Sequence, residues 1–168
     1  KLIATIADSA SFEWDSDGST STRATLITSA PTASRLSLVS TPDRHLVYFG
    51  TETTIGTTST QDDMYIRWSD QEDINTYTPT ATNTAGTQRI ADGTRIVGAI
   101  RGRDAIYVWT DNALFIMRFV GAPFTFSFQQ VGTGCGLIGK NAAVEVDGSA
   151  YWMSDNGFFR YTGKLESL

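Results

Sequence analysis

The sequence has few of the residues and patterns that define several common protein classes. Cys135 is its one cysteine, so no internal disulfide can form and a secreted fold held by disulfides is excluded. His45 is its one histidine, which leaves a zinc site without its usual histidine and cysteine partners. No apolar run approaches the ~18 residues that indicate a membrane-spanning helix, and no basic stretch followed by an apolar one predicts a signal peptide.

Positive charge is also scarce. Lysine and arginine number 13 against 18 aspartate and glutamate residues, a net charge of −5 at pH 7. Proteins that wrap DNA neutralise its phosphates with Lys and Arg, so we expect no such binding, while an acidic channel through which DNA passes remains compatible with this charge. Four arginines lie close together in the sequence, and we interpret them as solvated turn residues or partners of a neighbouring subunit: Arg89, Arg95, Arg101 and Arg103.

The abundant residues favour β-structure. Hydrophobic residues make up 40% of the chain and charged residues 18%, and Thr and Ser are frequent, which is typical of a folded β-rich protein and not of a disordered one. No segment carries a helical period of useful length. Because 168 residues are about one domain's worth, we predict a single all-β domain over residues 1–168.

One stretch of the chain occurs twice. Residues 105–119 read as a hydrophobic strand, a tight turn at Asp111 and a second hydrophobic strand. Residues 150–161 repeat this order, and the turn aspartate moves from 111 to Asp155, an offset of 44. A self-similar unit of about 40–50 residues built from short strands is typical of a β-propeller blade, in which four antiparallel strands are joined by turns.

We predict about three such units, over residues 32–93, 94–132 and 140–163, preceded by an extra strand or turn segment at 1–31. The first unit is lengthened by a polar insertion at 51–61, and the last shows only three strands. Propellers protect their strand edges by closing with typically four to eight blades. Three units therefore lead us to expect a functional assembly larger than this chain. Either a longer chain supplies further blades, or another subunit covers the open edges. A β-sandwich with similar hairpins is the alternative fold.

The predicted strands follow from alternating hydrophobic residues between turn-forming ones. They are residues 35–40, 45–50, 63–69 and 86–90 in the first unit, 95–100, 105–110, 113–119 and 125–131 in the second, and 142–146, 150–154 and 157–161 in the third.

Several segments in the same order resemble a known group of proteins. They are residues 43–47, 67–73, 77–86, 136–139 and 151–159. Together they resemble tail structural proteins of short-tailed bacteriophages and related prophages, of the nozzle or stabilisation type, over roughly residues 30–163. The resemblance implies a propeller-bearing virion protein at the distal end of the tail tube, assembled as a ring that is usually sixfold.

The partners implied by this resemblance are other copies of the chain in a ring, with a hexamer as the usual form, and other phage tail proteins. DNA would pass without sequence-specific binding, and the protein would be made in the bacterial host cytoplasm and end in the virion, without membrane insertion. The resemblance carries no catalytic, cofactor-binding or metal-binding residue across, so we expect no enzyme activity and no cofactor.

Residues 134–140 match two glycine-rich patterns, G-x-G-x-x-G and most of a phosphate-binding P-loop. Both require a helix after the loop, because the helix N-terminus holds the phosphate. Here residues 142–146 read as a strand, and Asn141 stands where Ser or Thr would hold magnesium. We therefore interpret the stretch, with Cys135 in it, as a connector between blades whose glycines permit a sharp change of direction.

The carboxylates of Glu13, Asp15 and Asp17 alternate before Gly18, as at the start of a calcium loop. The glutamate expected at the twelfth position is replaced by Ala24, and no helices flank the stretch. An exposed acidic turn is the favoured interpretation, and cation binding by the three carboxylates is left open.

The sequence offers no clear set of catalytic residues for hydrolysis. Glycoside hydrolysis needs two facing carboxylates, and the candidates lie in polar loops without an apolar setting that would raise the pKa of one of them. His45 could serve in a catalytic triad, but the sequence has no G-x-S-x-G elbow that would supply the serine nucleophile. We therefore place His45 at the start of a strand. The candidate carboxylates are Asp62, Asp63, Asp70, Glu72 and Asp73.

Aromatic residues offer a second route to glycan binding, because they stack on sugar rings. Three of the four tryptophans lie in predicted strands among aliphatic neighbours, so packing between blades is the favoured interpretation. We likewise read Asp111 and Asp155 as turn residues whose side chains bond the turn backbone. The tryptophans are Trp14, Trp68, Trp109 and Trp152.

The sequence thus predicts a non-enzymatic structural protein of a phage tail. Its alternative is a carbohydrate-binding or glycan-hydrolysing propeller module.

Overall fold

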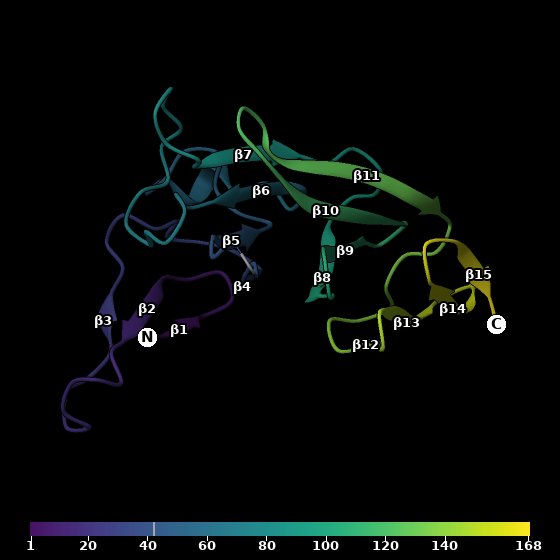
Figure 1. The fold of residues 1–168 in the computed structure, drawn as a ribbon, viewed down its shortest axis with the longest axis horizontal. Helices are drawn as coiled ribbons and strands as arrows, with labels where there is room; N and C mark the ends of the chain where they lie inside the picture. Colours follow the sequence, from purple (N-terminus) through teal and green to yellow (C-terminus); the bar gives the residue numbers. More distant parts are fainter. Residues whose placement is uncertain (42) are drawn as a thin grey trace.

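The computed structural model describes residues 1–41 and 43–168, and these residues form an all-β fold (Figure 1). The strands make four separate antiparallel sheets, one of three strands and three of four, and no closed barrel. Over the same residues, a single turn of 3₁₀ helix, η1 (Thr58–Thr60), is the one helical element. The all-β prediction is therefore confirmed.

Each sheet is a meander in which strands adjacent in sequence are adjacent in space, as short turns between antiparallel strands require. The first sheet contains β1 (Leu2–Thr5), β2 (Ser11–Trp14) and β3 (Thr25–Leu26). The second contains β4 (Leu36–Val39), β5 (Leu46–Phe49), β6 (Tyr65–Trp68) and β7 (Gly86–Arg89). The third contains β8 (Ile96–Arg101), β9 (Ile106–Thr110), β10 (Ala113–Gly121) and β11 (Thr125–Thr133). The fourth contains β12 (Ala143–Val146), β13 (Ser149–Ser154), β14 (Gly157–Tyr161) and β15 (Leu165–Ser167).

Two expectations about the ends of the chain need correction. The expected absence of a fourth strand after residue 161 is wrong, because β15 pairs with β14 through Tyr161 opposite Leu165. This strand has only three residues, too few for alternation to reveal it, and it follows a turn at Gly163, whose φ is +95°. Residues 1–31, expected as an extra strand or turn segment, contain the complete three-stranded first sheet.

The sheets stack face to face in chain order. Successive side chains of a strand point to opposite faces, and in β9 both sets are buried. Val108 joins a cluster shared with the second sheet, whereas Trp109 joins a cluster shared with the fourth. In β5, Val47 likewise packs toward the third sheet, and Tyr48 packs toward the segment that contains β3. The two inner sheets are therefore covered on both faces.

The first strands of the four-stranded sheets lie next to one another. β4 contacts β8, and β8 contacts β12. In Figure 1 the first sheet lies at the lower left of the molecule and the fourth at the right, with the second and third sheets between them. The stack thus has two ends, formed by β1–β3 and by β12–β15.

Candidate functional site

A group of polar side chains that includes the buried His45 and Asp43 lies where the turn between β4 and β5 meets the loop at 69–85. His45 is 0% exposed. Its Nδ1 lies 2.8 Å from Asp43 Oδ2, and its Nε2 lies 2.9 Å from Thr84 Oγ1. The Thr84 hydroxyl donates to Asp70 Oδ1 at 2.6 Å. An aspartate, histidine and hydroxyl in series is the arrangement that activates a hydroxyl nucleophile in several hydrolases.

The surroundings of Thr84 favour a structural role for this network. Its hydroxyl donates to Asp70, accepts from the Gln71 N–H at 2.9 Å and meets His45 Nε2. These contacts use its one proton and both lone pairs, so the oxygen has no free position for a substrate. The His45 ring packs against Phe119 and Phe126, with ring centroids 5.8 and 5.2 Å away. The network therefore pins the 69–85 loop to the start of β5.

Asp70 makes this network sensitive to acid. Hydrogen bonds from the Thr84 hydroxyl and backbone N–H stabilise its carboxylate and hold the pKa of Asp70 below its usual value. A depressed pKa in the folded state stabilises the fold above the ordinary aspartate pKa of about 3.9. That stabilisation is lost as the pH falls through the lower folded-state pKa.

We expect Asp70→Asn to flatten the acid side of the stability profile. The asparagine oxygen can still accept from Thr84, but it does not titrate, so the free energy of unfolding should fall less between about pH 5 and pH 2 than in the wild type. Urea unfolding across this range measures the slope. Asp155→Asn is the control, because the expected bond from its side chain to the turn backbone is absent and, in the described structure, the Asp155 carboxylate accepts no hydrogen bond; this variant should keep the wild-type slope. An unchanged slope in Asp70→Asn would show that the carboxylate does not carry the effect.

The five candidate carboxylates are all engaged in hydrogen bonds or ion pairs. Each is engaged by a different partner, and within residues 1–41 and 43–168 no group of three His, Cys, Asp or Glu side chains is placed to hold a metal ion. Besides the Asp70–Thr84 contact, the pairs are Asp62 with Arg89, Asp63 with Arg35, Glu72 with Arg44, and Asp73 with the Asn75 N–H and the Thr76 hydroxyl.

The acidic turn after β2 is organised by local contacts. Lys1 Nζ pairs with Glu13 Oε2 at 2.8 Å, and the Asp17 N–H donates to Asp15 Oδ1 at 3.0 Å. The second contact is the side-chain turn that aspartate typically makes with the backbone two residues on. Glu13 and Asp15 thus make their hydrogen bonds to separate partners.

The glycine-rich stretch at 134–140 is a connector between the third and fourth sheets. It leads from β11 into β12, so a strand follows where a phosphate loop needs a helix. The connector runs against the turn between β9 and β10: the Cys135 N–H donates to Asn112 O at 2.9 Å, and the Leu137 N–H donates to Thr110 O at 3.0 Å. Gly136 lies between them, where a Cβ would sit 2.2 Å from the Asp111 backbone carbonyl.

We expect Gly136→Ala to lower the free energy of unfolding by roughly 2–3 kcal/mol, because the added methyl group must displace backbone in a packed turn. Gly139→Ala in the same connector is the matched control, because its Cβ would meet no atom within 4 Å. Chemical unfolding of the two variants checks the difference. Equal losses would contradict the close approach at Gly136.

The four tryptophans differ in burial. Trp68, Trp109 and Trp152 are buried, as expected for core residues. Trp14 is half-buried, and its Nε1 donates to Thr22 O at 2.9 Å.

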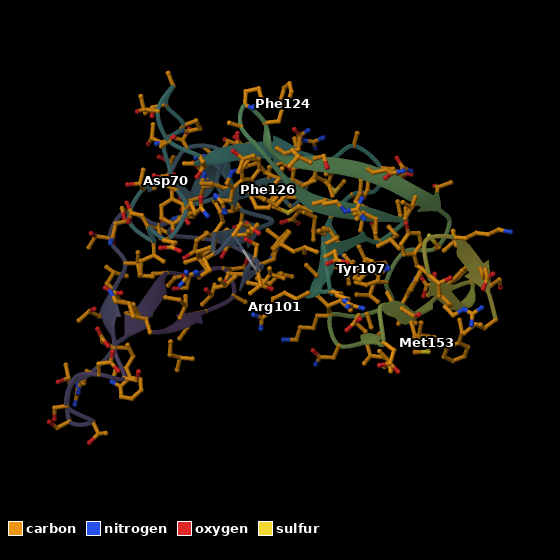
Figure 2. All side chains as sticks on the ribbon, viewed as in Figure 1. Asp70, Arg101, Tyr107, Phe124, Phe126 and Met153 are labelled. Carbon is orange, nitrogen blue, oxygen red and sulfur yellow. The ribbon has the colours of Figure 1, made fainter. Side chains whose placement is uncertain are left out.

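The four arginines do not form one patch. Arg89 pairs with Asp62, and Arg103 lies in the turn after β8. Arg95 directly precedes β8, and Arg101 ends it (Figure 2).

Several clefts open on the surface of the described residues, and two of them bear on candidate binding. The larger, about 540 Å³, lies between β4, β8 and residues 138–141, with Arg95 and Lys140 in its lining. Arg35 also lines it but is paired with Asp8 and Asp63. The second, about 420 Å³, lies beside the tip of the β10–β11 hairpin. There Phe124 is 75% exposed (Figure 2).

The first sheet leaves an apolar face uncovered. The Thr5 hydroxyl contacts Ser37 of β4 at 2.6 Å, so the face that carries Thr5 lies against the second sheet. Residues that pair across antiparallel strands share a face, which places the remaining set on the outside. This N-terminal face consists of Leu2, Ala4, Phe12, Trp14 and Leu26.

The fourth sheet leaves the opposite end uncovered. Trp152 and Phe159 pack toward the third sheet, so their neighbours Met153 and Phe158, which pair with each other, point outward. Figure 2 shows Met153 at the end of the molecule opposite β1–β3. A groove of about 210 Å³ crosses this side. The C-terminal face combines apolar residues with an ion pair and consists of Val144, Val146, Ser149, Tyr151, Met153, Phe158, Arg160 and Glu166.

No protein-family model matches this sequence, and a comparison with curated proteins gives no match. The fold therefore defines the class: an all-β protein of stacked antiparallel sheets. Over the described residues, no helix has the length and apolar character needed to cross a membrane.

Proposed function

We propose that the chain is a non-enzymatic structural component of a short-tailed bacteriophage tail, built from β-propeller blades and working in a ring around the DNA exit path. The observation that carries the proposal is the stack of sheets with an uncovered, largely apolar face at each end. Copies of the chain in a ring would cover these faces.

The arrangement of strands supports the assignment of the sheets as blades. Three consecutive four-stranded meanders pack face to face, and their first strands β4, β8 and β12 adjoin in order. In a propeller, four-stranded sheets are likewise repeated radially around a central axis. The proposed place in a phage tail comes from the sequence segments that resemble phage nozzle proteins. The same resemblance implies a ring of six copies.

The mechanism we propose is mechanical. An inner sheet buried on both faces resists bending, because bending would open close-packed apolar contacts. Rings of such sheets would form a stiff wall. The net charge of −5 disfavours adhesion of DNA phosphates to that wall. The loops at 51–61 and 71–80 would dock neighbouring tail proteins.

The test is the location of the chain in phage particles. Antibodies raised against the purified chain should label the tail end of short-tailed particles in electron micrographs, and virion digests should contain its peptides. Particles that lack both signals would overturn the proposal. Antibodies preincubated with the purified chain serve as the labelling control.

A second candidate function is glycan binding at the cleft beside Phe124. The cleft combines an exposed aromatic ring with the polar side chains of Thr80, Thr87 and Gln88, the combination that ligand sites for sugars use. A glycan array probed with the wild type and with Phe124→Ala tests it. Binding that the substitution abolishes would support this function, and an array without binding would rule it out.

A further inference from the structure

We propose that the cleft between β4, β8 and residues 138–141 binds a phosphate monoester, a small organic molecule with a terminal dianionic phosphate. Arg95 and Lys140 hold the phosphate, and the apolar part of the lining holds the organic group. This binding role goes beyond the proposed structural role and does not depend on it, because the cleft lies within one chain.

The cleft contains positive charge that no carboxylate of the described residues pairs with. Of the three cations in its lining, Arg35 binds both oxygens of Asp63, at 2.9 and 3.1 Å, and also contacts Asp8. The ion pairs among the described residues involve neither Arg95 nor Lys140. Two such cations in one cleft attract an anion, even in a chain whose net charge is −5.

Backbone donors lie in the same cleft. The N–H groups of Gly139, Lys140 and Asn141 donate to no acceptor within the described residues, and the Ala142 N–H closes a turn by donating to Gly139 O at 2.9 Å. Residues 139–141 all line the cleft. Backbone N–H groups together with cationic side chains are the donors with which proteins bind phosphate oxygens.

The two cations start from fixed points on different segments. Gly98 of β8 packs against the connector, and a Cβ there would lie 3.5 Å from Lys140 Cα. Arg95 lies three residues before Gly98, about 10 Å along the strand. Its backbone is held by the Asp111 N–H, which donates to Arg95 O at 3.1 Å. The phosphate therefore needs no helix N-terminus, because its donors come from the start of β8 and from the connector.

Charge and volume favour a phosphate monoester over other anions. A monoester carries a charge of about −1.5 to −2 at pH 7 and three acceptor oxygens, which suits two cations and several N–H donors. A carboxylate or a nucleic-acid phosphodiester carries only one negative charge. The cleft of about 540 Å³ is in the range of small-molecule sites, and its lining includes Leu36, Ala99 and Ile138. An apolar organic group fits against these side chains.

Nuclear magnetic resonance titrations of the isotope-labelled full chain test the proposal, at about pH 7.5, where the monoester is mostly dianionic, and at constant ionic strength. The probes are inorganic phosphate, phenyl phosphate and acetate. Both phosphates should shift the amide signals of Gly139, Lys140 and Asn141 saturably. Phenyl phosphate should bind more tightly than inorganic phosphate, because its ring adds buried apolar area. Acetate at equal concentration should cause no saturable shift.

Arg95→Gln and Lys140→Gln should each weaken the binding of phenyl phosphate about tenfold, the loss expected for one charge-assisted hydrogen bond at an exposed site. Arg101→Gln is the matched control, since Arg101 ends the same strand but lies outside the cleft lining (Figure 2). This variant should bind as the wild type does. All three positions are exposed, and circular dichroism of each variant verifies folding.

Several results would overturn the proposal: no saturable shift at residues 139–141, acetate binding as tight as that of phenyl phosphate, or unchanged affinity in both Arg95→Gln and Lys140→Gln. Inorganic phosphate binding as tightly as phenyl phosphate would overturn the organic part of the ligand. A short oligonucleotide without a terminal phosphate that binds more tightly than phenyl phosphate would overturn the monoester and assign the cleft to nucleic-acid phosphodiesters. The virion role is tested separately, by the labelling of phage particles.

Discussion

Replacing Trp109 with alanine should lower the free energy of unfolding by about 3–5 kcal/mol, the range for removing a large aromatic side chain from a core. Trp109 is 0% exposed on β9, the second strand of the third sheet. Its ring lies 5.4 Å from the ring of Trp152 in the fourth sheet and 6.0 Å from that of Tyr107. The alanine would leave a cavity in the contact between two sheets.

Trp109→Phe separates the cavity from the loss of a polar group. Among the described residues Trp109 Nε1 has no hydrogen-bond partner, so phenylalanine removes no hydrogen bond and leaves a smaller void. We expect this variant to cost about 1–2 kcal/mol. Urea unfolding followed by far-ultraviolet circular dichroism measures both variants. Equal losses from alanine and phenylalanine would show that the cavity does not govern the effect.

Replacing Glu52 with alanine should cost about 2–4 kcal/mol, because part-buried donors of Thr32 and Gly56 lose their acceptor, at roughly 1–3 kcal/mol for each donor that stays unsatisfied. Glu52 is 0% exposed. Its carboxylate accepts from the Gly56 N–H at 2.8 Å, the Thr32 N–H at 3.2 Å and the Thr32 hydroxyl. Burial lowers the pKa of the nearby Arg67, and the negative charge of Glu52 opposes that shift. Loss of Glu52 would therefore also remove a negative charge that stabilises the charged form of Arg67.

Two further variants calibrate the loss of unfolding free energy expected for Glu52→Ala. Glu52→Gln keeps one acceptor oxygen and places an N–H₂ against a donor, so its cost should lie between those of wild type and alanine. Glu72→Ala removes an exposed carboxylate paired with Arg44 and should cost less than about 1 kcal/mol. Guanidinium unfolding of the three variants tests this order. A Glu52→Ala variant as stable as Glu72→Ala would contradict the buried role.

Local signals were enough to predict most strands. The alternation and turn residues of 105–119 correspond to β9 and β10, because a strand with two buried faces is apolar along its length and a hairpin turn needs residues such as Asp111. The same reasoning failed at β15, whose three residues carry no period. The connector at 134–140 was also recognised, since a strand after the loop excludes a phosphate loop.

The polar sites were beyond the reach of such signals. The insertion at 51–61 reads as polar, yet Glu52 within it is fully buried. His45 stands at the start of β5 as expected, but its contact with Thr84 joins residues 39 positions apart. Neither residue lies in a motif that records its partner. Burial of a polar group depends on distant donors and acceptors arriving at the right distance.

The sequence by itself determined the all-β character, the turns and most strand positions, because these depend on residues within a few positions of each other. Only the tertiary structure decided which sheet covers which face. It placed Trp109 between two sheets and left Leu26 and Phe158 uncovered at the ends of the stack. Alternation marks a strand face as apolar but does not say what covers it, since that depends on packing between segments some 40 residues apart.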